Sequence, residues 1–320
     1  MKNLKNILFT VLLAFLFIEV LIIFPQRLEH KEDTAPAPLP TPADSAQPEQ
    51  KVQGMHLVES QQGSRDWELF SEMAEGSQGK GAWELKNIKV LFYNNEKVSF
   101  TVTGKTGTID GKSKDLRIKG DVVTKSANGY IFKTPSVLYR SKQRQIQSPE
   151  KVFMVGPKDE MGEGFELEGR NMLVKVDDSQ MTVNQDIRGS KKFKDGKTFV
   201  VKSDRAEFSG KSHQAKFLGN VDIRYADLRL QGPAAIFQYK GNTDLINYIQ
   251  MQGGVRVHDE DKLATAEIVN LDLLKNIFTF RGNPKVIQNS DELSGEEIIF
   301  LDGGKKVKVE KIRARMEKKE

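Results

Sequence analysis

Apolar and polar side chains alternate along short stretches of this chain, and this alternation restricts its possible folds more than any other feature. In GNVDIRY the side chains of Val221, Ile223 and Tyr225 fall on one side of an extended backbone and the polar ones on the other. The same pattern returns in KGDVVTK from Lys119 and in GGVRVHD from Gly253. Such alternation, bounded by turn residues, is typical of strands that bury one face. It predicts an all-β protein built of antiparallel strand pairs.

The strand pairs form an internal repeat of about 30 to 35 residues, a period typical of stacked supersecondary units. The units begin near Trp67, Val98, Tyr130, Phe165, Phe199, Leu228, Leu263 and Leu293. An apolar pair two residues apart recurs within them, at Val137/Tyr139, Ala206/Phe208, Ala235/Phe237, Val269/Leu271 and Ile298/Phe300. Because both members of a pair face the same side of a strand, stacked units would build one continuous apolar inner face.

Composition excludes several classes of site. The chain has no cysteine, and therefore no disulfide framework, no thiolate metal site and no cysteine nucleophile. Its four histidines, His30, His56, His213 and His258, are widely scattered, which argues against a multi-histidine metal site. The 49 basic and 44 acidic residues indicate a mixed surface rather than a nucleic-acid footprint. We predict no metal, no cofactor and no nucleic-acid partner.

Two fragments are similar to a phosphate-binding loop but lack its spacing. TGKTGT begins at Thr103 and SGKSH begins at Ser209. A Walker A loop needs a glycine five residues before its Gly-Lys-Ser/Thr, where this chain has Ser99 and Arg205. We therefore predict a protein without enzymatic activity and without catalytic residues.

An apolar segment near the N-terminus predicts a membrane anchor. It begins at Ile7 and ends at Phe24, and Glu19 is the one charged residue within it. As a helix it would be about 27 Å long, close to the hydrocarbon thickness of a bilayer. Pro25 follows directly, so we expect an uncleaved transmembrane helix, with the rest of the chain outside the cytoplasm. Glu19 would either contact a partner helix or reach the membrane interface.

Two successions of motifs resemble lipopolysaccharide transport proteins of Gram-negative bacteria. SRDWELFSEMAEGSQGKGAWELKNIKVLFY, VSFTVTGKTGTID and DLRIKGDVVTKSANGYIFKTPSVLY have the rhythm of the LptC family. FVVKSDRAEFSG, AKFLGNVDIRY, GGVRVHD and SGEEIIF are similar to LptA and the related OstA-like domains. The expected organisation is a transmembrane anchor over residues 1–25, a Pro/Ala-rich linker over 26–58, an LptC-like module over 59–190, an LptA-like module over 191–313 and a charged tail over 314–320.

The resemblance implies an open β-jellyroll whose hydrophobic groove holds lipid A acyl chains. It implies a single-pass inner-membrane protein with its body in the periplasm, which accepts lipopolysaccharide from an ATP-driven inner-membrane transporter of the LptB/LptF/LptG type. An LptA-like or LptD-like jellyroll would then pair with an exposed edge strand. The strand around Trp67 and the last strand, KKVKVEKI from Lys305, are the expected edges.

The inward-facing residues of the alternating strands are the expected lining of the groove. They are Ile109, Ile118, Val122, Val137, Tyr139, Ala206, Phe208, Phe217, Val221, Ile223, Ala235, Phe237, Val255, Val257, Val269, Leu271, Ile298 and Phe300. The pattern by itself also fits two alternatives, an anchored scaffold with a filled β core and a groove that carries phospholipid.

Overall fold

The computed structural model describes residues in one compact unit of the chain. Contacts divide the chain into Met1–Ser45 and Ala46–Glu320, and all described residues belong to the second unit. The described residues are 50–61, 63–76, 81–94, 96–240, 246–260, 262–289, 291–301, 306–311 and 313–315. None of them forms a helix long and apolar enough to cross a membrane. The expected anchor over residues 1–25, with Ile7, Glu19 and Phe24, lies outside the described residues, as does the expected linker up to residue 49.

Every regular element in these ranges is a β-strand, which confirms the all-β prediction. The strands are β1 (Gln50–Gln61), β2 (Ser64–Gly76), β3 (Ala82–Asn94), β4 (Lys97–Asp110), β5 (Leu116–Ser126), β6 (Ile131–Arg140), β7 (Gln145–Val155), β8 (Glu166–Lys175), β9 (Gln180–Lys192), β10 (Thr198–Ser203), β11 (Arg205–Ser209), β12 (Gln214–Tyr225), β13 (Leu228–Tyr239), β14 (Ile246–Asp259), β15 (Lys262–Asp272), β16 (Ile277–Arg281), β17 (Lys285–Gln288), β18 (Asp291–Ser294), β19 (Glu297–Leu301), β20 (Lys306–Glu310) and β21 (Arg313–Arg315).

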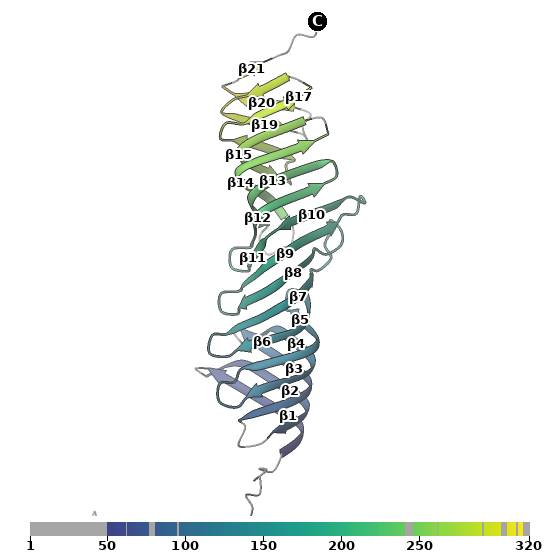
Figure 1. The fold of residues 1–320 in the computed structure, drawn as a ribbon, viewed down its shortest axis with the longest axis vertical. Coiled ribbons are helices and arrows are strands. Elements are labelled where there is room, and N and C mark those ends of the chain that lie inside the picture. The colour runs from purple at the N-terminus through teal and green to yellow at the C-terminus, as the bar shows by residue number, and fades with distance from the viewer. Residues whose placement is uncertain are drawn as a thin grey trace, which may run out of the picture. The chain divides into compact units, whose positions relative to one another are not determined.

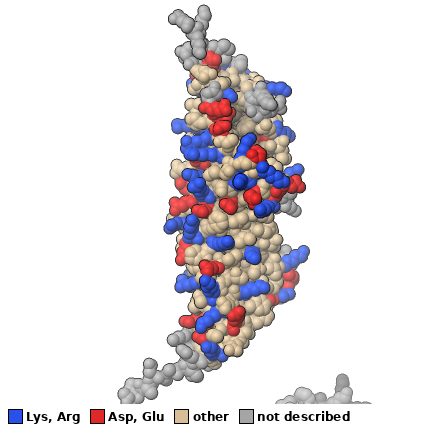
Figure 2. All heavy atoms as spheres, turned by 90° about the vertical axis from the view of Figure 1, so that its right-hand side faces the viewer, with Lys and Arg blue, Asp and Glu red and all other residues tan. Residues whose placement is uncertain are grey.

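From β1 to β9, each strand pairs antiparallel with the next one along the chain (Figure 1). Further along, long strands are interrupted into two segments. β10 and β11 both pair with β9 and β12, and β16 and β17 both pair with β15. β18 and β19 pair with β17 and β16, and β20 and β21 pair with β19 and β18. Each long strand, whole or interrupted, therefore lies beside the one that precedes it in the chain. Charged side chains of both signs are interspersed over the face seen in Figure 2, as expected for the polar side of alternating strands.

Most long strands bend near their middle, and the bend explains the repeated glycine motifs. In GNVDIRY, Gly219 and Asn220 have φ angles of 75° and 46°, and the pairing of β12 with β13 shifts register there. Left-handed backbone favours glycine and asparagine over other residues. An ideal Cβ on Gly219 would come within 2.4 Å of a carboxylate oxygen of Asp204, which lies in the break between β10 and β11, so a side chain here would also displace Asp204. Positive φ recurs at the other copies, at Gly120, Asp121, Gly253, Gly254, Gly282 and Asn283.

The bends fold the sheet into two facing layers. Ala215 and Tyr225 are ten residues apart on β12, which is about 33 Å in a straight strand. Ala215 pairs with Phe237 and Tyr225 pairs with Phe199, yet the rings of Phe199 and Phe237 have centroids only 5.7 Å apart. The strand must therefore double back between them.

We call the two halves of this folded sheet the first and second layers. The first layer ends at turns that include residues 126–131, 155–166 and 192–198, and the second at turns that include 110–116, 140–145, 175–180 and 209–214. The layers also meet where Tyr139 of the second layer contacts Phe92 of the first, with ring centroids 4.8 Å apart. This two-layer sheet fits the jellyroll-like architecture expected from the sequence.

Among the described residues, the buried apolar side chains form two hydrophobic clusters. The first is centred on Trp67 and Tyr139 and the second on Phe217 and Phe237. They separate within β7, where Ile146 belongs to the first cluster and Val152 to the second. The backbone nevertheless continues without a break through the expected module boundary at 190/191, because β9 pairs with β8 on one side and with β10 and β11 on the other.

Two expectations at the N-terminal edge are wrong. The strand around Trp67 is not an edge, because β2 pairs with β1 on one side and with β3 on the other. The outermost strand β1 begins at Gln50, inside the segment expected to be linker. Its sequence has only a weak apolar stripe, in which Met55 and Leu57 pack against the first cluster. The backbone hydrogen bonds to β2 define this strand more than side-chain burial does.

The glycine pair at the bend of β14 gives a matched test of these bends. Gly253 and Gly254 have φ angles of 91° and 85°, but a Cβ on Gly253 would lie 2.7 Å from Cγ of Pro233, whereas none lies within 4 Å of a Cβ on Gly254. Both Gly→Ala substitutions add backbone strain of about 1–2 kcal/mol, and Gly253→Ala adds a steric term of about 1–3 kcal/mol. Urea unfolding followed by circular dichroism should show the larger loss for Gly253→Ala, and equal losses would contradict the packing derived for this bend.

Candidate functional site

A groove lies between the two layers, where the two hydrophobic clusters separate. It encloses about 600 Å³, within the range of sites that hold small ligands. Its apolar lining comes from both layers and consists of Phe100, Tyr130, Phe132, Ile146, Met154, Phe165, Met172, Val174, Val176, Met181, Phe208 and Tyr239. Val174 packs against both clusters. The groove is therefore a part of the interior that the side chains of the described residues leave open.

The strand ends position these side chains. Phe132 follows the turn between β5 and β6 in the first layer, and Phe208 precedes the turn between β11 and β12 in the second. Both are half-buried, unlike the inward residues near the bends. The inward residues near the bends are buried, whereas these strand-end residues are partly exposed, so the groove opens on the side of the strand ends.

The predicted lining residues lie on the inner face, but most of them are in the packed core. All of them are buried except Phe208 and Phe300, which are partly buried and pack against the second cluster. Phe208 is the member of the set that lines the groove. The alternation had a period of two and could identify the inner face, but it could not distinguish filled from open positions along that face.

Phe132, Phe165 and Val174 were not among the predicted lining residues, although a local signal could have indicated Phe132 and Phe165. Phe132 lies just after the turn residues SANG and Phe165 just after the loop GPKDEMGEG. A large apolar side chain next to a turn is near the open end of a strand, where a second layer covers it less completely.

Polar groups surround the mouth of the groove. Lys175, Lys211, His213 and Gln214 line it on the second layer. The ammonium of Lys211 is 3.8 Å from a carboxylate oxygen of Asp178, an exposed contact that contributes little to stability. An apolar interior with a polar, partly basic rim suits an amphiphile with an anionic end.

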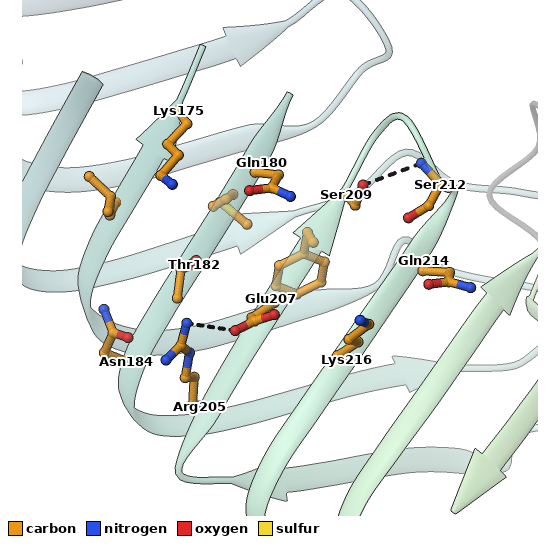
Figure 3. A pocket seen from close by; sticks show the side chains of 13 residues that line it. Lys175, Gln180, Thr182, Asn184, Arg205, Glu207, Ser209, Ser212, Gln214 and Lys216 are labelled. Carbon is orange, nitrogen blue, oxygen red and sulfur yellow. Dashed lines mark hydrogen bonds and ion pairs between the residues drawn. The ribbon is translucent and has the colours of Figure 1, made fainter. Parts of the chain in front are cut away.

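A second, polar pocket of about 300 Å³ lies on the outer face of the second layer (Figure 3). Strands β8, β9, β11 and β12 present it, and their register places outward side chains in rows. One row contains Leu173, Thr182, Glu207 and Lys216, and the row at the strand ends contains Lys175, Gln180, Ser209 and Gln214. Arg205 lies in the next row and forms an ion pair of 2.6 Å with Glu207. We call this space, which Met181, Asn184, Phe208 and Ser212 also line, the outer pocket.

Neither the groove nor the outer pocket contains a reactive constellation. In the ranges that the structure describes, no group of three or more His, Cys, Asp or Glu side chains could hold a metal ion. Burial, followed by the charge of Asp177, raises the pKa of the Tyr139 phenol, so this core hydroxyl stays neutral at physiological pH. The arrangement can bind and shield an apolar ligand.

Comparison with known proteins assigns both parts of the chain. A family model described as lipopolysaccharide-assembly, LptC-related, matches residues 11–192, more than half of the chain. A second, described as LptA/(LptD N-terminal domain) LPS transport protein, matches residues 200–303. No curated protein matches.

Among solved structures, the chain is similar to LptH of Pseudomonas aeruginosa, described as the LptA-homologous periplasmic component of the conserved lipopolysaccharide transport device. The identity is 16%, the match covers 38% of this chain and 95% of that one, and the TM-score is 0.34. The family matches confirm the two resemblances seen in the sequence. The chain belongs to the LptC-related family of lipopolysaccharide-assembly proteins and carries an LptA/LptD N-terminal-like transport module in the same polypeptide.

Proposed function

We propose that this protein is a non-enzymatic conduit that holds the acyl chains of lipopolysaccharide in the groove between its layers. The observation that carries the proposal is the shared lining of the groove. Phe132 and Phe165 come from the LptC-related match, whereas Phe208 and Tyr239 come from the LptA-like match. Both modules therefore contribute to one apolar space, which favours a lipid carrier over a scaffold with a filled core.

Energetics explain why such a conduit is needed. Burial of acyl chains is worth about 0.8 kcal/mol per CH₂, so a chain of roughly twelve carbons resists transfer to water by about 10 kcal/mol. A walled groove removes that barrier, because movement between similar apolar sites has little net free-energy change. The direction of transport must come from outside the groove, and an ATP-driven LptB/LptF/LptG-type transporter in the inner membrane is the proposed source.

The proposed location is the inner membrane, with the jellyroll in the periplasm. The apolar segment between Ile7 and Phe24, which contains one charged residue, Glu19, supports a single transmembrane anchor. The LptC-related match begins at residue 11, within that segment. We keep the anchor limits 1–25 and the module boundary at 190/191 that were proposed from the sequence. The proposed linker is shortened, so that it ends before β1 begins at Gln50.

The outermost strands are the proposed docking sites for protein partners. In the described part of the chain, β1 pairs only with β2, and β20 pairs only with β19. The side chains of Val52 on β1 and Val307 on β20 are 40% and 47% exposed. An added strand from a partner would satisfy the free backbone groups and cover these valines. We propose that β1 faces the inner-membrane transporter and that β20 faces an LptA-like or LptD-like jellyroll.

Photo-crosslinking in living cells tests the groove. A crosslinking residue at Phe132, which lines the groove, should form adducts with lipopolysaccharide, and so should one at Phe208. The same residue at Lys133, which is exposed on the opposite face of β6, is the matched control and should form none. Phospholipid adducts at Phe132 in place of lipopolysaccharide adducts would identify phospholipid as the cargo. The absence of lipid adducts at both groove positions would contradict the proposal.

The buried members of the predicted lining are tested in the same way. Phe237 is 1% exposed and its ring contacts those of Phe199 and Phe217. An adduct at Phe237 requires the two layers to separate around the lipid, and would extend the groove into the second cluster. Adducts at Phe208 without any at Phe237 would limit the lipid to the open part of the interior.

A further inference from the structure

The outer pocket adjoins the groove along the ends of the second-layer strands. Six residues line both spaces: Lys175, Gln180, Met181, Phe208, Ser209 and Gln214. The turns at 175–180 and 209–214 therefore form a rim with the apolar groove on one side and the polar pocket on the other. A single amphiphilic molecule could occupy both spaces by crossing this rim.

The charges of the outer pocket select for an anion. It contains three basic side chains, Lys175, Arg205 and Lys216, and one acidic side chain, Glu207, which is already paired with Arg205. In the ranges that the structure describes, neither Lys175 nor Lys216 has an acidic side chain within ion-pair distance. The two ammonium groups are thus available to a ligand, since their register across β8 and β12 places them on the same outer face.

The uncharged groups of the outer pocket suit a ligand with many hydroxyl groups. Thr182, Asn184 and Ser209 supply hydroxyl and amide groups to the pocket, on β9 and β11 (Figure 3). The side-chain amide of Gln214 donates a hydrogen bond to Gln238. This leaves the carbonyl oxygen of Gln214 as an acceptor for a ligand hydroxyl. Ammonium groups together with neutral donors and acceptors are the chemistry that recognises a phosphorylated sugar.

We infer that the outer pocket binds the phosphorylated saccharide head of the lipid whose acyl chains lie in the groove. This inference rests on the proposed function, because the groove must hold the same molecule. The head group crosses the rim between Lys175 and Ser209, and its phosphate groups lie beside the ammonium groups of Lys175 on β8 and Lys216 on β12, which are three strands apart. The rim thereby fixes where along the chain the lipid pauses, whereas the apolar lining alone would not.

Binding of two lipids to the purified full-length chain in detergent tests the inference. The probes are bisphosphorylated lipid A and the same lipid with both phosphates removed. Lys175→Gln/Lys216→Gln should bind phosphorylated lipid A roughly fivefold to tenfold more weakly than the unaltered chain, as expected for the loss of two exposed charge contacts. It should bind the dephosphorylated lipid equally well. The matched control Lys119→Gln/Lys133→Gln removes two exposed lysines from β5 and β6 and should change neither affinity.

Each other outcome overturns the inference in a recognisable way. Unchanged binding of phosphorylated lipid A by Lys175→Gln/Lys216→Gln would contradict the proposed head-group site but not the proposed groove. An equal loss of affinity for both lipids would show that the two lysines affect the fold or the groove rather than a phosphate site. If glucosamine 1-phosphate bound as tightly as lipid A, the pocket would be a site for free sugar phosphates. Failure of the unaltered chain to bind either lipid would contradict the proposed function itself.

Discussion

Phe132→Glu is expected to weaken lipopolysaccharide binding by more than about 100-fold while the sheet stays folded. Phe132 is half-buried at the groove wall, at a strand end next to a turn, so the carboxylate can reach water in the empty protein. An acyl chain in the groove would remove that water, and desolvation of an unpaired carboxylate opposes binding by several kcal/mol. A loss of about 2.7 kcal/mol already corresponds to 100-fold. Equilibrium binding of purified lipopolysaccharide measures the effect.

Two control variants separate the carboxylate's effect from other causes. Phe132→Leu keeps an apolar wall and should retain binding within a few fold. Lys133→Glu places the same carboxylate on the adjacent, outward residue and should also retain binding, because no lipid covers that face. Circular dichroism confirms folding of each variant. Normal binding by a folded Phe132→Glu protein would show that the lipid does not use this groove.

Phe237→Ala is expected to lower the free energy of unfolding by about 3–5 kcal/mol, the usual loss when a buried phenylalanine is truncated. Phe237 is 1% exposed, and its ring lies 4.8 Å from that of Phe217 and 5.7 Å from that of Phe199. The Phe199 contact joins the two layers, so truncation leaves a cavity between them that rigid strands cannot close. Urea denaturation followed by circular dichroism measures the loss.

The conservative variant Phe237→Leu tests whether packing volume is the cause. It keeps most of the buried volume, so its loss in free energy of unfolding should be smaller than that of Phe237→Ala, by more than about 1.5 kcal/mol. The folded fraction of Phe237→Leu should bind lipopolysaccharide normally if the lipid stays in the open part of the interior. A loss below about 1 kcal/mol for Phe237→Ala would contradict the packed interior described for the second cluster.

Local sequence patterns predicted the strands and their inner face because both depend on neighbours in the chain. Val221 and Ile223 lie on the buried face of β12, as their spacing indicates. The Gly-Asn, Gly-Asp and Gly-Gly steps of the repeated motifs mark the bends, although those motifs were interpreted above only as alternating strands and as a family resemblance. A left-handed φ is a local requirement, so such steps would predict bends in other chains of this kind.

The groove could not be predicted in the same way, because it depends on which strands face each other across the layers. Phe132 and Phe208 are 76 positions apart in the sequence and belong to different modules, yet both line one space. The edge at β1 was missed for a related reason. Its pairing rests on backbone hydrogen bonds, which leave little trace in side-chain pattern.

The sequence by itself determined the strand content, the inner face, the repeat and the membership of an LptC-related family with a second LptA-like module. These properties are encoded in residues close together, in alternation and in turn glycines. Only the tertiary structure decided that one sheet continues through both modules, that the core separates at β7, and that this separation leaves an apolar groove of about 600 Å³ beside a polar pocket. Those features arise from packing between distant strands, where the volumes of opposing side chains determine whether the space between the layers is filled.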